Sequence, residues 1–225
     1  MAESAYPTDS QISTFVTNSG VVLPSGYVFT NYGAAASAWW EEQTGYQPFL
    51  QTASATRTFN PPGDQPKNRS WTNLQWGGGT ILNLNAAIAN QAAFVSLSVQ
   101  GVTAAWTLGT NFWLEPINAP AQGQPYTRIR FSYPIYGAAY CVSVTALWGW
   151  GATIPEDAFQ AILRKGAQMA MVDILEGIAT ATLSIYQGDE RFVIEPRILM
   201  KSGEGWGLYA DRAAERYKFR NWGLI

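Results

Sequence analysis

The longest helical pattern in this chain is IPEDAFQAILRKGAQMAMVDILEGIATATLSIY, residues 154–186. Its spacing of three and four residues predicts one apolar stripe, made of Phe159, Ile162, Leu163, Ala167, Ala170, Met171, Ile174, Leu175 and Ile178. Thr153 and Glu156 have the spacing of a capping box, and Gly188 is a suitable stop. We expect one long helix that needs apolar partners, because burial of its stripe must offset the loss of chain entropy.

Two shorter helical patterns lie near the N-terminus. Thr8 or Asp9 can cap the first helix, which Gly20 can end. The second pattern runs from about residue 28 to residue 44 and precedes a stop at Gly45. Its expected apolar side consists of Val28, Tyr32, Ala35, Ala36, Trp39 and Trp40.

From residue 53 to residue 150 the apolar period changes to two, which is typical of strands. The segments that favour strands include residues 56–59, 71–76, 127–131 and 140–148. The three glycines at 77–79 are expected to break the pattern as a turn. Six or seven short strands predict an antiparallel sheet pair or a small barrel.

The order of these elements predicts an α+β protein. We expect a small helical bundle of two N-terminal helices and one long C-terminal helix, with an inserted antiparallel β module and an extended C-terminal tail. The predicted segments are 1–52 for the N-terminal helices, 53–150 for the β module, 151–187 for the long helix that completes the bundle, and 188–225 for a docking tail.

The tail is rich in aromatic and basic residues, the types enriched at interface hot spots. One short helix is expected, at about residues 208–220. The candidate docking residues are Trp206, Tyr209, Arg212, Arg216, Tyr217, Phe219, Arg220 and Trp222. We expect the tail to become ordered on a partner; the alternative is a tail that folds back on its own chain.

Charged residues make up only 13% of the chain, about half the usual share, whereas aromatic residues make up 14%. Such a surface favours an oligomer or a stable complex, although a monomer with a neutral polar surface stays open. A net charge of −2 argues against a nucleic-acid binder of the basic kind. Residues 1–56 carry a net charge of −4 and residues 201–225 carry +2, so copies could associate head to tail.

Cys141 is the single cysteine and lies in an alternating apolar run, so we expect a buried thiol and no internal disulfide. No secretory leader pattern and no apolar run of membrane-spanning length is present. We therefore expect a protein that is made and kept in a reducing compartment.

Nothing in the sequence indicates catalysis. The chain has no histidine, which removes the commonest general base and metal ligand. Its acidic pairs are sequence neighbours, which point in different directions on a helix, and the glycines at 77–79 lack the lysine of a phosphate loop. We expect no enzyme, no cofactor and no metal, although a glycosidase with two distant carboxylates remains an alternative.

Several short motifs stand in a characteristic order. They are Tyr6-Pro7-Thr8-Asp9, Trp40-Glu41-Glu42-Gln43-Thr44-Gly45-Tyr46-Gln47-Pro48-Phe49, Arg57-Thr58-Phe59, Trp113-Leu114, Asn118-Ala119-Pro120, Pro125-Tyr126-Thr127, Trp148-Gly149 and Ile154-Pro155-Glu156-Asp157. This ordered set, over roughly residues 5–185, resembles the head–tail adaptor (connector) proteins of tailed double-stranded DNA bacteriophages.

The resemblance implies a structural virion protein of the neck, made in the host cytoplasm and without catalytic activity. Such proteins form a ring, expected to have twelve copies, which lies beneath the portal protein, prolongs the DNA channel and presents a surface to the next neck or tail protein (stopper, terminator or tail tube). DNA would pass through the lumen without specific binding, and no membrane is involved. The C-terminal tail would dock on the portal, and deletion of residues 206–225 would abolish that binding while the body stays folded.

Two other interpretations stay open. The chain could be another neck or tail-completion protein, of the stopper or terminator kind, which would bind the tail tube or terminator rather than the portal. In a different class, residues 53–150 could form a carbohydrate-binding β module, because exposed tryptophans can stack on sugars.

Overall fold

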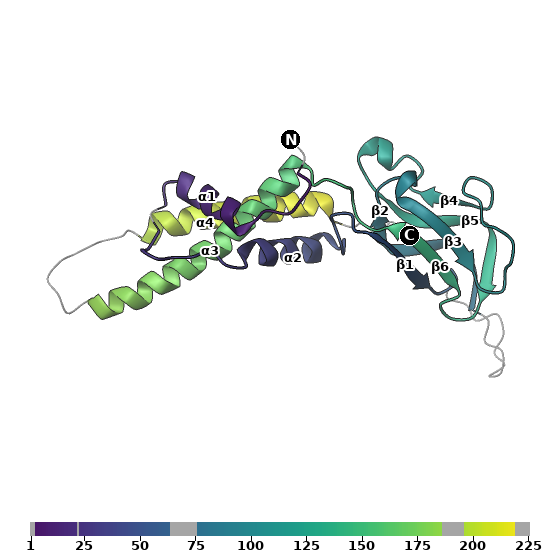
Figure 1. Cartoon of the computed structure of the whole chain (residues 1–225), viewed down its shortest axis with the longest axis horizontal. Coiled ribbons are helices and arrows are strands. Elements are labelled where there is room, and N and C mark those ends of the chain that lie inside the picture. Colours follow the sequence, from purple (N-terminus) through teal and green to yellow (C-terminus); the bar gives the residue numbers. More distant parts are fainter. Residues whose placement is uncertain (1–2, 22, 64–75, 186–195, 219–225) are drawn as a thin grey trace. The chain divides into compact units, whose positions relative to one another are not determined.

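The computed structural model describes residues 3–21, 23–63, 76–185 and 196–218 (Figure 1). The protein is an α+β protein with two compact units. The helical unit comprises Met1–Gly45 and Thr153–Ile225, and the β unit comprises Tyr46–Ala152. In the sequence, the β unit is thus inserted between the two halves of the helical unit.

The helical unit contains α1 (Asp9–Asn18), α2 (Tyr32–Thr44), α3 (Glu156–Ile185) and α4 (Pro196–Tyr217). The central element is α3, because the other three helices all pack against it (Figure 1). The apolar stripe predicted for α3 is buried from Phe159 to Ile174, whereas Leu175 is half-buried. Hydrophobic burial along this stripe therefore holds the unit together.

The first two helices begin with different caps. Thr8 forms a capping box with Gln11: the Gln11 amide donates to Thr8 Oγ1 at 3.3 Å, and the Thr8 amide donates to Gln11 Oε1 at 2.9 Å. Asn31, the N-cap residue of α2, makes no such bond. Instead, Asp9 of α1 accepts from the amides of Asn31 and Gly33, each at 2.8 Å. The negative charge of this carboxylate is also stabilised by the positive N-terminal end of the α2 dipole.

The start of α2 differs from the prediction, which placed it near residue 28. Val28 is 72% exposed and lies before the helix rather than on its apolar side. Asn31 has a positive φ of 67°, so a right-handed helix cannot continue backwards through it. The helix ends, as expected, before Gly45 in the left-handed conformation.

Residues 196–217 form helix α4, which corrects the prediction of an extended tail: the short helix expected at about 208–220 begins twelve residues earlier, at Pro196. A Cβ added to Gly203 would lie 3.7 Å from Met171 Cβ, and one added to Gly207 would lie 2.4 Å from Gln168 Nε2. Both glycines lie where α4 faces α3, Gly203 with room for a methyl group and Gly207 against the Gln168 side chain, and packing offsets their cost of about 1 kcal/mol each in helix propensity. The same helix also buries Ala210, Ala213 and Ala214.

The β unit contains two three-stranded antiparallel sheets. One consists of β1 (Ser54–Phe59), β6 (Val142–Leu147) and β3 (Phe94–Val99), in that order. The other consists of β2 (Trp76–Ile88), β5 (Tyr126–Gly137) and β4 (Phe112–Glu115). Short 3-10 helices span Gln91–Ala93 and Pro120–Gln122. Alternate apolar residues of both sheets meet in one buried core, as in a small sandwich.

The glycines at 77–79 lie within β2, not in the predicted turn. The Gly79 amide donates to the Pro62 carbonyl at 2.8 Å, and a Cβ on Gly79 would lie 3.0 Å from that same carbonyl. The register with β5 shifts on both sides of Gly79. Glycine is needed here because another backbone segment crosses the strand closely. The strand predicted at 71–76 lies outside the described residues except for Trp76.

The chain enters and leaves the β unit through one paired segment. The Trp150 amide donates to the Phe49 carbonyl at 2.6 Å, and the Gln51 amide donates to the Gly151 carbonyl at 2.8 Å. The rings of Phe49 and Trp150 stack with their centroids 5.4 Å apart. These contacts explain why the unit starts at Tyr46, seven residues before the boundary that the sequence predicted.

Candidate functional site

Five of the eight candidate docking residues lie on α4: Trp206, Tyr209, Arg212, Arg216 and Tyr217. The other three, Phe219, Arg220 and Trp222, lie outside the described residues. The first five side chains fall into two groups, those that contact other helices and those that lie at the surface. Trp206, Arg216 and Tyr217 contact other helices of the same unit, whereas Arg212 is exposed and Tyr209 lies at the margin.

Trp206 and Tyr217 pack inward rather than into solvent. The ring of Trp206 meets Phe15 of α1 edge-on at 5.1 Å, and the ring of Tyr217 lies 5.5 Å from Trp40 of α2. Tyr217 also donates its hydroxyl to Asp157 at 2.6 Å. Burial, and secondarily this bond, raises the pKa of Tyr217 above its ordinary value. These contacts fasten α4 to its own unit and leave both aromatic side chains half-buried.

Arg216 is also engaged within the unit. Its Nη2 lies 3.4 Å from Asp157 Oδ2, although 62% of the side chain stays exposed. Arg212 is exposed, and no ion pair is found for it among the described residues. Of the two arginines, Arg212 is therefore the one that can pair with an external acid.

Tyr209 lies over a half-buried arginine. The Arg164 guanidinium sits 4.3 Å from the centroid of the Tyr209 ring and 5.7 Å from that of Phe15. A cation over an aromatic face is attracted by the ring quadrupole, which fixes the orientation of Tyr209. The ring is still 36% exposed and can contact a partner with its outer edge.

Leu208 is a residue that the sequence interpretation missed. It is 59% exposed, and Arg212 follows it one helical turn later on the same side of α4. Together with Tyr209 these residues form what we call the α4 surface: Leu208, Tyr209 and Arg212. The signal was available in principle, because Leu208 falls away from the glycine and alanine face that meets α3.

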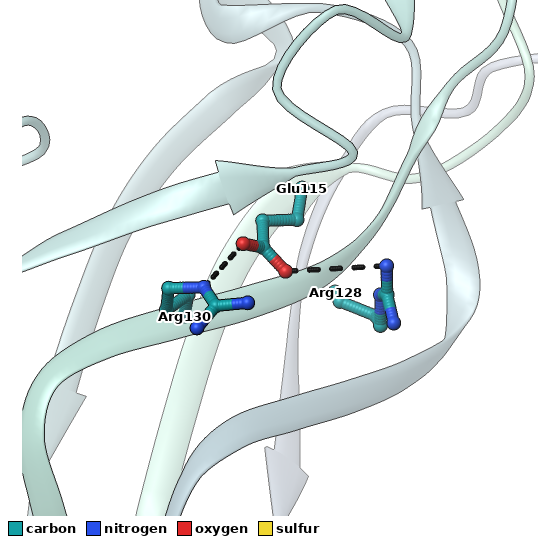
Figure 2. Close-up of polar contacts among 3 residues, drawn as sticks. All are labelled: Glu115, Arg128 and Arg130. Carbon is teal, nitrogen blue, oxygen red and sulfur yellow. Dashed lines mark hydrogen bonds and ion pairs between the residues drawn. The ribbon is translucent and has the colours of Figure 1, made fainter. Parts of the chain in front are cut away.

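A second candidate surface lies on the β2–β5–β4 sheet. Glu115 of β4 lies between two arginines of β5 (Figure 2). Arg130 donates from Nε to Glu115 Oε1, and Arg128 Nη2 lies 4.0 Å from Glu115 Oε2. Two cations share one anion, so the group carries a formal charge of +1.

The strand register places Arg130 opposite Trp113 of β4 and Ile81 of β2. Ile81 is 36% exposed and Trp113 is half-buried. Charged and apolar side chains therefore lie together on the outer side of this sheet. We call the group of Ile81, Trp113, Glu115, Arg128 and Arg130 the Arg130 face.

The outer side of the β1–β6–β3 sheet is different, because it carries only hydroxyl groups in its two central rows. The register aligns Thr56, Thr145 and Ser96 in one row and Thr58, Ser143 and Ser98 in the next. Thr56 and Thr145 are joined by a hydroxyl–hydroxyl bond of 2.8 Å. This surface is polar and has no formal charge.

Arg57 is the remaining described cation of the β unit. Its guanidinium lies 4.6 Å from the centroid of Trp148, and it donates to the Gln47 carbonyl at 3.0 Å. Burial lowers the pKa of Arg57. Among the described residues of this unit, the Arg130 face thus holds three of the four charged side chains.

A shallow groove between α1 and α3 is lined by Phe15, Phe159, Leu163 and small polar side chains, and none of its lining residues is ionisable. No group of three or more metal-binding side chains occurs among the described residues. Cys141 is buried, as expected, and burial raises its thiol pKa. In the described part of the chain, no helix is long and apolar enough to cross a membrane.

Comparisons with models of known protein families, with curated proteins and with solved structures find no match to this chain. The α4 surface, the Arg130 face and the ordered sequence motifs are therefore the features of this protein that bear on its function.

Proposed function

We propose that this protein is a structural component of a tailed bacteriophage virion, a head–tail adaptor. In this proposal several copies form a ring beneath the portal protein, extend the DNA channel and present a surface to the next neck or tail protein. The ordered motifs of the sequence support this function. The low share of charged residues also supports it, because a ring subunit has large surfaces covered by its neighbours.

The main support is that motifs far apart in the sequence lie close together in the structure. Tyr6 of the first motif donates its hydroxyl to Glu41 of the second at 2.6 Å. The second motif ends at Phe49, whose carbonyl accepts from the amide of Trp150, next to the Trp148-Gly149 motif. The motifs thus form the framework from which the β unit is inserted, which gives their order a structural reason.

The α4 surface is the part of the predicted docking tail that is best placed to meet the portal. Leu208 and Tyr209 supply apolar contact area, and Arg212 supplies a charge for an acidic partner group. Phe219, Arg220 and Trp222 follow α4 in sequence and extend the same docking segment.

The deletion of residues 206–225 is no longer a suitable test. It would remove Ala210, Ala213 and Ala214 from the core, and also the contacts that Trp206 and Tyr217 make with α1 and α2. Loss of binding would then follow from unfolding of the helical unit. Changes confined to the exposed side of α4 separate the two effects.

The experiment is to measure the mass of the protein alone and mixed with the portal protein of the same virus, by native mass spectrometry. We expect a complex with several copies per portal ring. The double variant Leu208→Glu, Arg212→Glu should bind the portal at least about tenfold more weakly. The first change puts a charge in place of an apolar contact, and the second puts a negative charge opposite the acidic partner group. The control is Val172→Glu, which changes an apolar residue of α3 that is 48% exposed. It should leave portal binding unchanged.

Two results would contradict this function. A wild-type protein that never associates with the portal, but binds a tail tube or terminator, would identify another kind of neck protein. A protein that binds neither and stays monomeric would rule out both. If the double variant binds as tightly as the wild type, the adaptor function stands but the α4 surface is not the docking site.

A further inference from the structure

The two units carry net charges of opposite sign. Residues 46–152 contain five Arg or Lys and two Asp or Glu, a net charge of +3. The rest of the chain contains nine Arg or Lys and fourteen Asp or Glu, a net charge of −5. The overall charge of −2 conceals this separation. Division by structural unit therefore reveals an asymmetry larger than the one between the two sequence ends.

This separation restricts how two copies can meet. Two helical units repel each other, and so do two β units, whereas the β unit of one copy attracts the helical unit of the next. A contact between unlike surfaces is heterologous, so every copy keeps one unused surface of each kind. Contacts of this type build a ring when the rotation between neighbouring copies closes, and an open filament when it does not.

The charge of the β unit is accessible at Arg130. Its side chain is 49% exposed, whereas that of Glu115 is 15% exposed and that of Arg128 is 22% exposed. Within the described residues, only Nε of Arg130 is bonded, so the two terminal nitrogens of the guanidinium are left for an outside acceptor (Figure 2). Glu115 holds the guanidinium in place, and a fixed fork of this kind binds carboxylates in a defined geometry.

The β1–β6–β3 sheet cannot attract an acidic helical unit in this way. Its two central rows expose hydroxyl groups only, and Arg57 is bound to Trp148 and the Gln47 carbonyl on the other side. Ile81 and Trp113 add apolar area beside Arg130, the combination that interface centres favour.

We infer that the Arg130 face of one copy binds the acidic helical unit of a second copy. This inference rests on the proposed ring and names the surface that builds it. The partner is another copy of this chain, selected by the complementary charge of its helical unit. The attraction is electrostatic, so it should weaken with salt as the screening length falls below about 10 Å above 0.1 M.

The test compares two charge reversals of equal size. Arg130→Glu lies in the β unit and Lys218→Glu lies in the helical unit; both side chains are 49% exposed, and both are paired with a glutamate. Each change takes the net charge from −2 to −4, so general repulsion is the same in both. Self-association is measured by sedimentation velocity at low and high salt, without portal, and circular dichroism checks that each variant is folded.

We expect Arg130→Glu to weaken self-association by about tenfold or more and to remove its salt dependence. Lys218→Glu should leave association equal or stronger, because it makes the helical unit more acidic. Equal effects of the two reversals, with wild-type association intact, would overturn the assignment of the face and leave the ring standing. Wild-type protein that stays monomeric at low salt in this measurement, and again in a second run with portal added, would overturn both. A changed shape of the monomer without a changed mass would show that the charges act within one copy and would also overturn the inference.

Discussion

The Asp9 carboxylate accepts a hydrogen bond from the backbone amide of Gly33 at 2.8 Å, so one helix supplies the cap of another. Asp9 occupies the first turn of α1, and its second oxygen accepts from Asn31 at the start of α2. A Cβ on Gly33 would lie 2.4 Å from the Pro7 carbonyl, which shows how closely the two segments approach. The N-terminal motif thus fixes where the second helix begins.

Replacement of Asp9 by alanine should destabilise the helical unit by about 1–3 kcal/mol, because two amides at the start of α2 lose a charged acceptor. Chemical denaturation followed by circular dichroism measures this change. Ser10→Ala alters the neighbouring, exposed position and should cost much less. Equal losses in the two variants would show that Asp9 does not cap α2.

Gly205→Ala should stabilise the helical unit by up to about 1 kcal/mol, because alanine is the better helix former in an exposed helix interior. Gly205 is exposed, and a Cβ there would meet nothing within 4 Å. Gly207→Ala is the matched comparison: its Cβ would overlap the Gln168 side chain, so that side chain has to move. Thermal unfolding measures the stability of both variants. An unchanged stability in Gly205→Ala would argue that this part of the chain is not helical.

Tyr217→Phe removes the hydroxyl bonded to Asp157 and should cost about 1.5–3 kcal/mol, the usual range for a hydrogen bond to a charged group. Arg216→Ala, which removes an exposed ion pair to the same carboxylate, should cost about 1 kcal/mol or less. Urea unfolding at neutral pH compares the two. A larger loss in Arg216→Ala would reverse the assigned roles.

The same tyrosine predicts a dependence on alkaline pH. Burial and the bond to Asp157 raise the pKa of Tyr217 above its ordinary value of 10.0. A group whose pKa is higher in the folded than in the unfolded state stabilises fully below the unfolded value and loses this effect as pH rises. The free energy of unfolding should therefore fall above pH 10.0 and fall less steeply in Tyr217→Phe. Identical slopes in the two proteins would contradict this.

Gly149→Ala should destabilise the β unit more than Gly101→Ala does. Gly149 has a φ of 148°, and a Cβ there would lie 2.5 Å from the Gln51 Cα. The backbone strain alone costs about 1–3 kcal/mol. Gly101→Ala is the control, because Gly101 also has a positive φ but open space around it. Near-UV circular dichroism during unfolding reports on both, and equal losses would exclude the steric contribution.

The sequence predicted the elements that have a strong period or a clear cap. The stripe of α3, the capping residue Thr8 and the stop at Gly45 could all be identified, because local chemistry determines them. It predicted only the second half of α4, as a short helix at about residues 208–220, because Gly203 and Gly207 count as helix breakers until the neighbouring surface of α3 is known. It placed a turn at Gly79 for the same reason, since the Pro62 carbonyl that requires glycine there is distant in the sequence.

The candidate site divides in a similar way. Residue type alone identified Tyr209 and Arg212, which do reach the surface, but also Trp206 and Tyr217, which pack inward. Composition does not distinguish an aromatic residue that fastens a helix from one that binds a partner. The Arg130 face was not predicted, because it depends on the pairing of β4 with β5.

The insertion of the β unit has a consequence for synthesis on the ribosome. Residues 46–152 are complete and can begin to fold while the second half of the helical unit is still being translated. By contrast, α1 and α2 must wait for α3 and α4, which are made last. A nascent chain released early would thus present a finished sandwich attached to two helices without their partners, a species that would be prone to aggregate.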